Sequence, residues 1–225
     1  MQSTLRKKVA RTAFLALCVV GILAPTPAKA MLVTYAFQGA ITQVSDNLFT
    51  PSGTGSNGMN TGLQLRGTYT FNTLSAPAGN GNFHNALTSL TVQIGNYSAT
   101  QSFGQNLIQI QNGQVDRYHL LSSVSGNTVK GLSPSMFEIL FRDPTGAAFS
   151  SNAQLPSTPP SLNSFNTNRW RLSFGSNGFV QGSITSLRAV PLPASVILFG
   201  AGLIALIGLG AGRFRQTQER TNTAS

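Results

Sequence analysis

Apolar and polar residues alternate along much of the chain between residues 31 and 188, and this period constrains the fold more than any other feature. Trp170, Leu172 and Phe174, for example, are each separated by a single polar residue. Successive side chains of a strand point to opposite faces of a sheet, so a period of two is typical of half-buried strands. No ten-residue stretch of this region has a clear helical period. The sequence therefore predicts a mainly β domain.

Turn signals divide the alternating region into short strands. Asn112-Gly113 and Asn177-Gly178 are typical of tight hairpin turns, and Asp143-Pro144-Thr145-Gly146 is a turn by composition. Residues 46–61 and 152–168 are rich in Gly, Ser, Asn or Pro, and we expect both to be loops. The expected strands cover residues 32–41, 63–71, 87–94, 107–110, 115–124, 136–142, 169–174 and 179–187. Strands at this spacing favour a single β-sandwich or jelly-roll-like domain.

The formal charge of +10 is unevenly distributed along the chain. Residues 1–30 contain five basic residues and no acid, whereas residues 31–190 contain seven basic residues and four acids. No basic patch is interleaved with aromatic residues, so we expect no nucleic-acid partner. The only cysteine is Cys18, in the first apolar run, which predicts a mature domain without disulfides or a cysteine-based metal site. Leu17 precedes it where lipoprotein processing needs a small residue, so we expect no lipidation.

The first 30 residues have the three-part layout of a secretory signal peptide. A short basic segment is followed by an uncharged apolar run over Ala13–Ala24 and by Ala28-Lys29-Ala30, which has small residues at both recognition positions. The apolar run is shorter than the roughly 20 residues of a transmembrane helix. We predict export through the Sec translocon and cleavage by signal peptidase after Ala30, which makes Met31 the first residue of the mature domain, 31–188.

The C-terminal region predicts a membrane-spanning helix between residues 189 and 215. Residues 194–211 are apolar apart from Ser195, and Arg213 and Arg215 follow directly. Eighteen residues at about 1.5 Å each give roughly 27 Å, close to the thickness of a bilayer core. Basic residues after a span favour a cytoplasmic location for that end. We therefore expect residues 216–225 to be a polar cytoplasmic tail and the large domain to lie outside.

The segment Val190-Pro191-Leu192-Pro193-Ala194, followed by the apolar helix and by Arg213 and Arg215, resembles the PEP-CTERM sorting signal in its VPLPA variant. The commonest form of that signal has Glu between the prolines, where this chain has Leu192. The resemblance implies a Gram-negative source, an exosortase-type processing enzyme as partner, and transient anchoring in the inner membrane before release to the cell surface or the extracellular space. A plain membrane anchor without processing is the alternative, and the residues do not decide whether the tail is cleaved or retained.

Residues that carry chemistry are few between 31 and 190, so we expect no enzyme activity, no catalytic residues, no metal site and no cofactor. Asp116 and His119 are three residues apart, which places them on opposite faces of a strand. The amide-rich domain suits contact with exopolysaccharide. Candidate sugar-contacting aromatics are Trp170, Tyr69, Tyr97 and Tyr118, although the phase of Trp170 with Leu172 and Phe174 favours a core position for its ring.

These features together predict an exported, non-enzymatic cell-surface or extracellular-matrix protein that is associated with exopolysaccharide in a biofilm. Two alternatives remain open at this point. A dedicated carbohydrate-binding module would present an exposed row of aromatic residues. A secreted carbohydrate-active enzyme would need two carboxylates that converge in a cleft.

Overall fold

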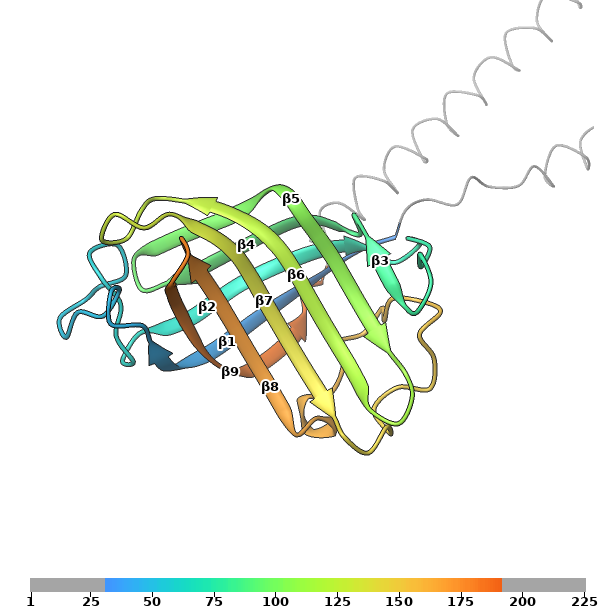
Figure 1. Cartoon of the computed structure of the whole chain (residues 1–225). Coiled ribbons are helices and arrows are strands. Elements are labelled where there is room, and N and C mark those ends of the chain that lie inside the picture. The colour runs from blue at the N-terminus through green and yellow to red at the C-terminus, as the bar shows by residue number, and fades with distance from the viewer. Residues whose placement is uncertain (1–30, 192–225) are drawn as a thin grey trace, which may run out of the picture. The chain divides into compact units, whose positions relative to one another are not determined.

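The computed structural model describes residues 31–191, which form one antiparallel β-sheet that closes on itself (Figure 1). The nine strands are β1 (Leu32–Val44), β2 (Gln64–Asn72), β3 (Asn82–His84), β4 (Leu87–Ile94), β5 (Tyr97–Gln111), β6 (Asp116–Gly126), β7 (Pro134–Asp143), β8 (Thr167–Phe174) and β9 (Gly178–Ala189). One short 3₁₀ helix, η2 (Leu162–Ser164), precedes β8. The chain is therefore mainly β, as the alternation of its residues predicts.

Strand β5 closes the sheet into a barrel. Residues 99–100 pair with β4 on one side and with β6 on the other, so that the strand order β5-β4-β2-β1-β9-β8-β7-β6 returns to β5. Beyond a bulge between Gln101 and Asn106, β5 continues along β6 and takes β3 as its second neighbour. The result is a ring of eight strands. The short β3 pairs only with β5 and is not part of the ring.

The expectation of a β-sandwich or jelly roll is therefore wrong. A sandwich consists of two separate sheets, each with free edges, whereas here hydrogen bonds continue from β4 through β5 to β6 and close the ring. Inward and outward residues alternate in the same way in both architectures, so the alternation alone could not distinguish them. The decisive strand is β5, of which only residues 107–110 are expected from the sequence, and its first half supplies the pairing that closes the barrel.

Where β5 leaves β4, the side chain of Asn106 replaces the missing strand contacts. Its Oδ1 accepts a hydrogen bond from the backbone nitrogen of Leu87 at 3.1 Å, and its Nδ2 donates to the carbonyl oxygen of the same residue at 2.8 Å. The backbone carbonyl of Asn106 accepts a further bond from the nitrogen of Asn85 at 2.9 Å. Asn106 thus satisfies backbone groups that would otherwise lack partners, in the manner of a neighbouring strand.

Large side chains from every strand of the ring fill the interior. Rings pack edge to face or in stacks, for example Tyr35 against Phe71 at 5.1 Å and Phe37 against Phe137 at 5.5 Å between centroids. Small residues let backbones approach where strands cross closely. A Cβ on Gly182 of β9 would collide with the backbone of Ala40 on β1, next to the register shifts of that strand pair. Side chains therefore fill the interior of the barrel, and the hollows described for residues 31–191 lie on its outer surface.

Most expected strands and both expected long loops are found, with two differences. The strands β3 and the first half of β5 lie where the sequence pattern predicted no strand. The loops 45–63 and 144–166 connect β1 to β2 and β7 to β8. The predicted signal peptide, with Ala28 and Ala30, lies outside the described residues. So do the motif residues Leu192, Pro193 and Ala194, the membrane helix, Arg213 and Arg215. Within residues 31–191, no helical segment has the length and hydropathy needed to cross a bilayer.

Candidate binding faces

The four aromatic residues proposed as sugar contacts all lie in the core. Trp170, Tyr69 and Tyr118 have no exposed surface, and Tyr97 is 1% exposed. The polar tips of three of them are bonded inside: the Trp170 Nε1 donates to the Ala40 carbonyl at 3.2 Å, and the hydroxyls of Tyr69 and Tyr118 share a bond of 3.0 Å. These rings cannot stack on a sugar at the surface, so the prediction of a platform from these residues is wrong, and the alternative core position of Trp170 is confirmed.

Burial also keeps the phenols protonated. It raises the pKa of Tyr97 to about 12 and also raises the pKa of Tyr69 and of Tyr118, since a phenolate in the core would lose its hydration. The Tyr97 hydroxyl has no hydrogen-bond partner among the described residues. These groups therefore stabilise the core through ring packing and offer no acid or base for catalysis near neutral pH.

Two of the four acids of the barrel domain are buried structural groups. Asp116 of β6 and Asp143 of β7 are register partners, and the two residues are 0% and 2% exposed to solvent. Asp116 accepts bonds from the backbone nitrogens of Gly113 and Phe149, at 3.0 and 2.7 Å. Asp143 accepts bonds from the backbone nitrogens of residues 145, 147 and 148 and from the Thr145 hydroxyl. The bonds to Thr145 are the main reason that the pKa of Asp143 is lowered.

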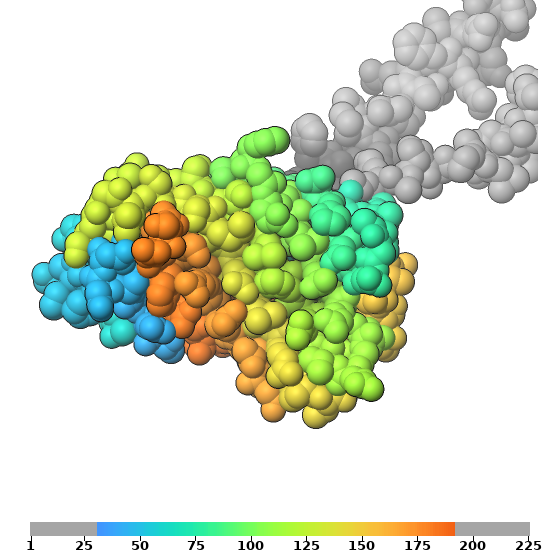
Figure 2. All heavy atoms as spheres, in the orientation of Figure 1, coloured from blue at the N-terminus to red at the C-terminus, as the bar shows by residue number. Residues whose placement is uncertain are grey.

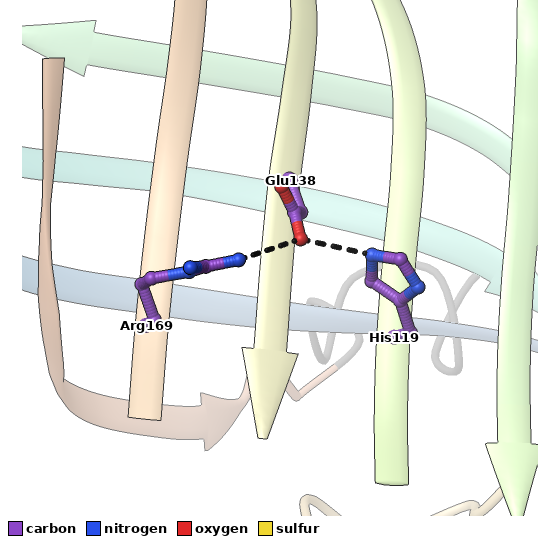
Figure 3. Close-up of polar contacts among 3 residues, drawn as sticks. All are labelled: His119, Glu138 and Arg169. Carbon is purple, nitrogen blue, oxygen red and sulfur yellow. Dashed lines mark hydrogen bonds and ion pairs between the residues drawn. The ribbon is translucent and has the colours of Figure 1, made fainter. Parts of the chain in front are cut away.

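The third acid, Glu138, is the centre of a polar network on the outside of the barrel (Figure 3). Its Oε1 lies 3.1 Å from His119 Nε2 and 3.2 Å from Arg169 Nη2. These three residues come from neighbouring strands, β7, β6 and β8, which place them side by side. The hydrogen bond from His119 is the largest cause of the lowered pKa of Glu138, and Arg169 adds to it. Glu138 is therefore ionised at neutral pH and unsuited to act as a general acid.

We call the outward side of β6, β7 and β8 the arginine face, and Figure 2 shows the side chains that cover it. Its four arginines lie close to acids of the same strands. In sequence, Arg117 follows Asp116 and Arg142 precedes Asp143. Glu138 bonds to Arg169 and is the register neighbour of Arg171. The guanidinium of Arg171 also lies 4.2 Å from the centroid of the Phe179 ring. Asp116 and Asp143 point into the barrel, so on the outer surface only Glu138 lies beside the four arginines.

The opposite side of the barrel has a different composition. We call the outward side of β1, β2, β4, residues 97–101 of β5 and residues 186–189 of β9 the acid-free face, because none of these strands contains Asp or Glu. Threonine hydroxyls form pairs across it, such as Thr68 with Thr91 at 3.0 Å and Thr34 with Thr70 at 2.8 Å. The face carries two arginines, Arg66 of β2 and Arg188 of β9.

A groove of about 530 Å³ crosses the acid-free face. Its lining residues come from β9, β1, β2, β4 and β5, and they are Ala36, Phe37, Gln38, Arg66, Gly67, Thr68, Thr91, Val92, Gln93, Ser98 and Arg188. A second hollow of about 260 Å³ shares Arg66 and Gln93 with it and extends to Gln64 and Gly95. The larger volume lies within the range of about 300–1,000 Å³ that small-molecule sites occupy.

Both arginines of the groove are exposed. The guanidinium group of neither one makes a hydrogen bond or ion pair with another residue of the described range 31–191. Arg66 is the register neighbour of Gln38 on β1, and Arg188 is the register neighbour of Ala36 on the other side of the same strand. The groove therefore combines two available guanidinium groups with amides and hydroxyls, a set that binds carboxylates and sugar hydroxyls.

The described carboxylates do not assemble into a catalytic pair or a metal site. Asp116 and Asp143 are adjacent but bonded to backbone nitrogens, Glu138 is held by His119 and Arg169, and Asp46 lies in the loop after β1. Within residues 31–191, no three His, Cys, Asp or Glu side chains are grouped so that they could hold a metal ion. As expected from their odd spacing, Asp116 points inward and His119 outward.

The groove could not be found from the residues alone, because Gln38, Arg66, Gln93 and Arg188 lie far apart in the sequence. The available signal was the absence of acids from the expected strands 32–41, 63–71, 87–94 and 179–187. Comparisons with protein families, with curated proteins and with solved structures find no match for this chain.

Proposed function

We propose that this chain is an exported, non-enzymatic protein of the cell surface or extracellular matrix, sorted by its C-terminal segment and associated with exopolysaccharide. The observation that carries the association is the groove on the acid-free face, where amides, hydroxyls and two guanidinium groups are available to a polar ligand. The signal-peptide layout of residues 1–30 and the VPLPA-like segment at 190–194 support export and sorting.

The boundaries of the barrel support this plan. Strand β1 begins at Leu32, directly after the proposed signal-peptidase site at Ala30, and β9 ends at Ala189, directly before the proposed sorting motif. Val190 is 40% exposed and contributes one backbone hydrogen bond, to the carbonyl of Thr34 at 2.8 Å. Processing at either end would therefore remove no strand of the barrel.

A carbohydrate-binding module is the second candidate function, and the same groove favours it. An exposed row of aromatics, the feature we expected for such a module, is not formed by Trp170, Tyr69, Tyr97 and Tyr118, which are buried. A module of this kind would use hydrogen bonds and charge more than ring stacking. The two candidates differ in whether glycan binding is the whole task of the protein or serves to retain it in a matrix.

The sorting part of the proposal is tested by intact-mass analysis of protein recovered from the native host, with and without the gene for the processing enzyme. We expect a chain that begins at Met31 and ends near residues 191–194 only in the strain that has the gene. A chain that retains residues 213–225 in both strains would contradict sorting and leave a plain membrane anchor.

The matrix part is tested by fractionation of the same cultures. We expect the processed protein to co-sediment with the extracellular polysaccharide and to be released when that polysaccharide is degraded enzymatically. A processed protein that remains entirely in the soluble medium, with polysaccharide present, would contradict the association.

A further inference from the structure

We propose that the groove on the acid-free face is a binding site for an acidic polysaccharide, in which Arg66 and Arg188 hold carboxylate groups of uronic-acid residues. This inference rests on the proposed association with exopolysaccharide, and it names the chemical class of the ligand and the residues that recognise it. It follows from the charge of the face, the state of the two arginines, and the shape and lining of the groove.

The charge of the strands favours an anionic ligand at this face. Strands β1, β2, β4, β5 and β9 contain two arginines and no acid, whereas β6, β7 and β8 contain four arginines and three acids. When a groove carries charges of one sign above a low-dielectric core, the electric field is focused into the groove and attracts ligands of the opposite charge. The positive potential at Arg66 and Arg188 is not offset by a neighbouring carboxylate of the described strands.

The two guanidinium groups are available to a ligand. On the arginine face, Arg169 already bonds to Glu138 and Arg171 lies over a phenyl ring. Arg66 and Arg188 have no such partner among residues 31–191. The same is true of Arg117 and Arg142, but of these four arginines only Arg66 and Arg188 line the groove. A guanidinium binds a carboxylate through two parallel hydrogen bonds, which is stronger and more directional than the contact of an ammonium.

The spacing of the two arginines suits a chain rather than a single small anion. They flank β1 on opposite sides and are displaced by two residues along it, since Arg66 pairs with Gln38 and Arg188 with Ala36. Strand geometry gives roughly 12 Å between their Cα atoms. One short oligosaccharide with two acidic residues can reach both, and the hollow at Gln64 and Gly95 continues the path beyond Arg66.

Small residues form the floor of the groove between the arginines. Ala36 and Gly67 lie in this floor, and Gly67 faces the core, where a Cβ would collide with the Phe37 ring and the Thr91 carbonyl. The side chains of Gln38 and Gln93 border this floor, and Thr68, Thr91 and Ser98 add hydroxyls. Amides and hydroxyls both donate and accept, so they match the hydroxyl groups of a sugar chain between its carboxylates.

A glycan fits this groove better than a nucleic acid does. Proteins that bind single strands stack bases on exposed aromatic rings, and the one aromatic residue in the lining, Phe37, is 1% exposed. A duplex is held by many phosphate contacts, and this groove offers two cations. The lining therefore matches a polymer that carries both carboxylates and many hydroxyls.

The test measures binding of the purified full-length chain, in a non-ionic detergent at fixed ionic strength, to polygalacturonate, to neutral dextran and to single-stranded DNA. The variant Arg66→Gln/Arg188→Gln removes both guanidinium groups, and Arg117→Gln/Arg142→Gln removes two cations from the arginine face as a matched control. The variant Arg66→Lys/Arg188→Lys keeps the positive charge and removes the planar guanidinium group that donates two parallel hydrogen bonds. All three replace side chains on the outside of the barrel, and circular dichroism checks that each variant keeps the fold.

We expect the wild-type chain to bind polygalacturonate in preference to the other two polymers. Loss of both groove arginines should weaken binding about tenfold or more, because each removes a charge-assisted contact. The lysine variant should lie in between, and the control should change binding less than about twofold. Equal losses in the groove variant and the control would overturn the proposal in favour of diffuse attraction, and DNA binding of similar strength with the same loss would overturn the glycan assignment.

Fractionation of wild-type cultures separates this inference from the proposed function. Wild-type protein that co-sediments with the native matrix but does not bind polygalacturonate would overturn the acidic-glycan site and leave the matrix role standing. Wild-type protein that is absent from the matrix, whatever it binds in the purified state, would contradict the proposed function itself.

Discussion

The two outer faces of the barrel carry similar kinds of residues but differ in what their arginines can do. On the arginine face, Arg169 bonds to Glu138 and Arg171 lies over the Phe179 ring, so two of the four guanidinium groups are already engaged. On the acid-free face, two arginines stand beside a groove without a carboxylate partner on the described strands. The number of cations is therefore a poor guide to a binding site, and the partners and the free volume around each cation decide.

Strand β5 connects the two sides of the barrel, because it pairs with β4 of the acid-free face and with β6 of the arginine face. Residues 97–101 lie beside β4 on the acid-free face, and residues 106–111 lie between β3 and β6 on the other side of the bulge. At the bulge, the Phe103 side chain is fully exposed, at 105% of its reference area, and a Cβ on Gly104 would crowd Ser123. The bend of β5 stands above the surrounding surface in Figure 2.

The largest expected effect comes from Gly67→Val, which adds a side chain to the core beneath the groove. The new side chain would collide with the Phe37 ring below and the Thr91 carbonyl beside it, so we expect a loss of about 3 kcal/mol in the free energy of unfolding. Urea denaturation followed by circular dichroism measures it. Gly113→Ala is the matched control, since a Cβ there meets nothing within 4 Å and should change stability by less than about 0.5 kcal/mol. Equal effects of the two substitutions would contradict the packing described under the groove.

Asn106→Ala removes the side chain that joins the two parts of β5 to β4. The backbone nitrogen of Leu87 would lose the bond to Asn106, and its carbonyl would keep only the longer bond from Gln101 Nε2 at 3.4 Å, so we expect a loss of about 2 kcal/mol in the free energy of unfolding. Hydrogen exchange should increase first in β4 and β5. Gln105→Ala serves as control because its side chain is exposed and its own backbone nitrogen keeps the bond to Ser123. Unchanged exchange in Asn106→Ala would rule out its role in closing the ring.

Glu138→Gln changes the arginine face alone, and its expected effect is smaller. The network is partly exposed, so we expect a loss of about 0.5 kcal/mol near neutral pH. The folded-state pKa of Glu138 is lowered from its usual value of 4.5, so its contribution is present above that value and is lost as pH falls through the folded pKa. The stabilities of wild type and variant should converge in acid. A difference that grows as the pH falls would contradict the network.

Phe103→Ser should have the smallest effect on the fold. The ring is fully exposed and packs against no other aromatic ring of residues 31–191, so the melting temperature should stay within about 2 °C of wild type. Differential scanning calorimetry measures it, with Phe137→Ser as the contrasting core substitution, whose ring has no exposed surface. A large fall in the melting temperature of Phe103→Ser would contradict the full exposure of this ring.

Local features of the fold could be predicted from the sequence because they depend on neighbouring residues. The alternation through Trp170 and the proline-rich loop before β8 are both found, and the chain reverses after Asn112-Gly113, although through residues 112–115 and not through a two-residue turn. Ring closure depends on β5 pairing at residues 99–101 with two strands that are distant in sequence, and no local pattern specifies this. The same limit applies to the groove, whose residues meet only after the register of β1 with β2 and β9 is fixed.

The prediction for the four aromatic residues was wrong although the sequence contained the information needed to place them in the core. Tyr69, Tyr97 and Tyr118 alternate in phase with apolar neighbours, so the same pattern that predicts strands also places their rings inside the barrel. A tyrosine has a polar tip, but Tyr69 and Tyr118 satisfy theirs on each other in the core. Polar character was therefore a weaker guide than phase along the strand.

Chemical footprinting of arginines on the full-length chain tests the central claim most directly. Phenylglyoxal modifies accessible guanidinium groups, and mass spectrometry of the peptides gives the rate at each residue with and without oligogalacturonate. We predict that the ligand slows modification of Arg66 and Arg188 several-fold and leaves Arg117 and Arg142 unchanged. Equal protection of all four arginines, or protection confined to Arg117 and Arg142, would contradict a site on the acid-free face.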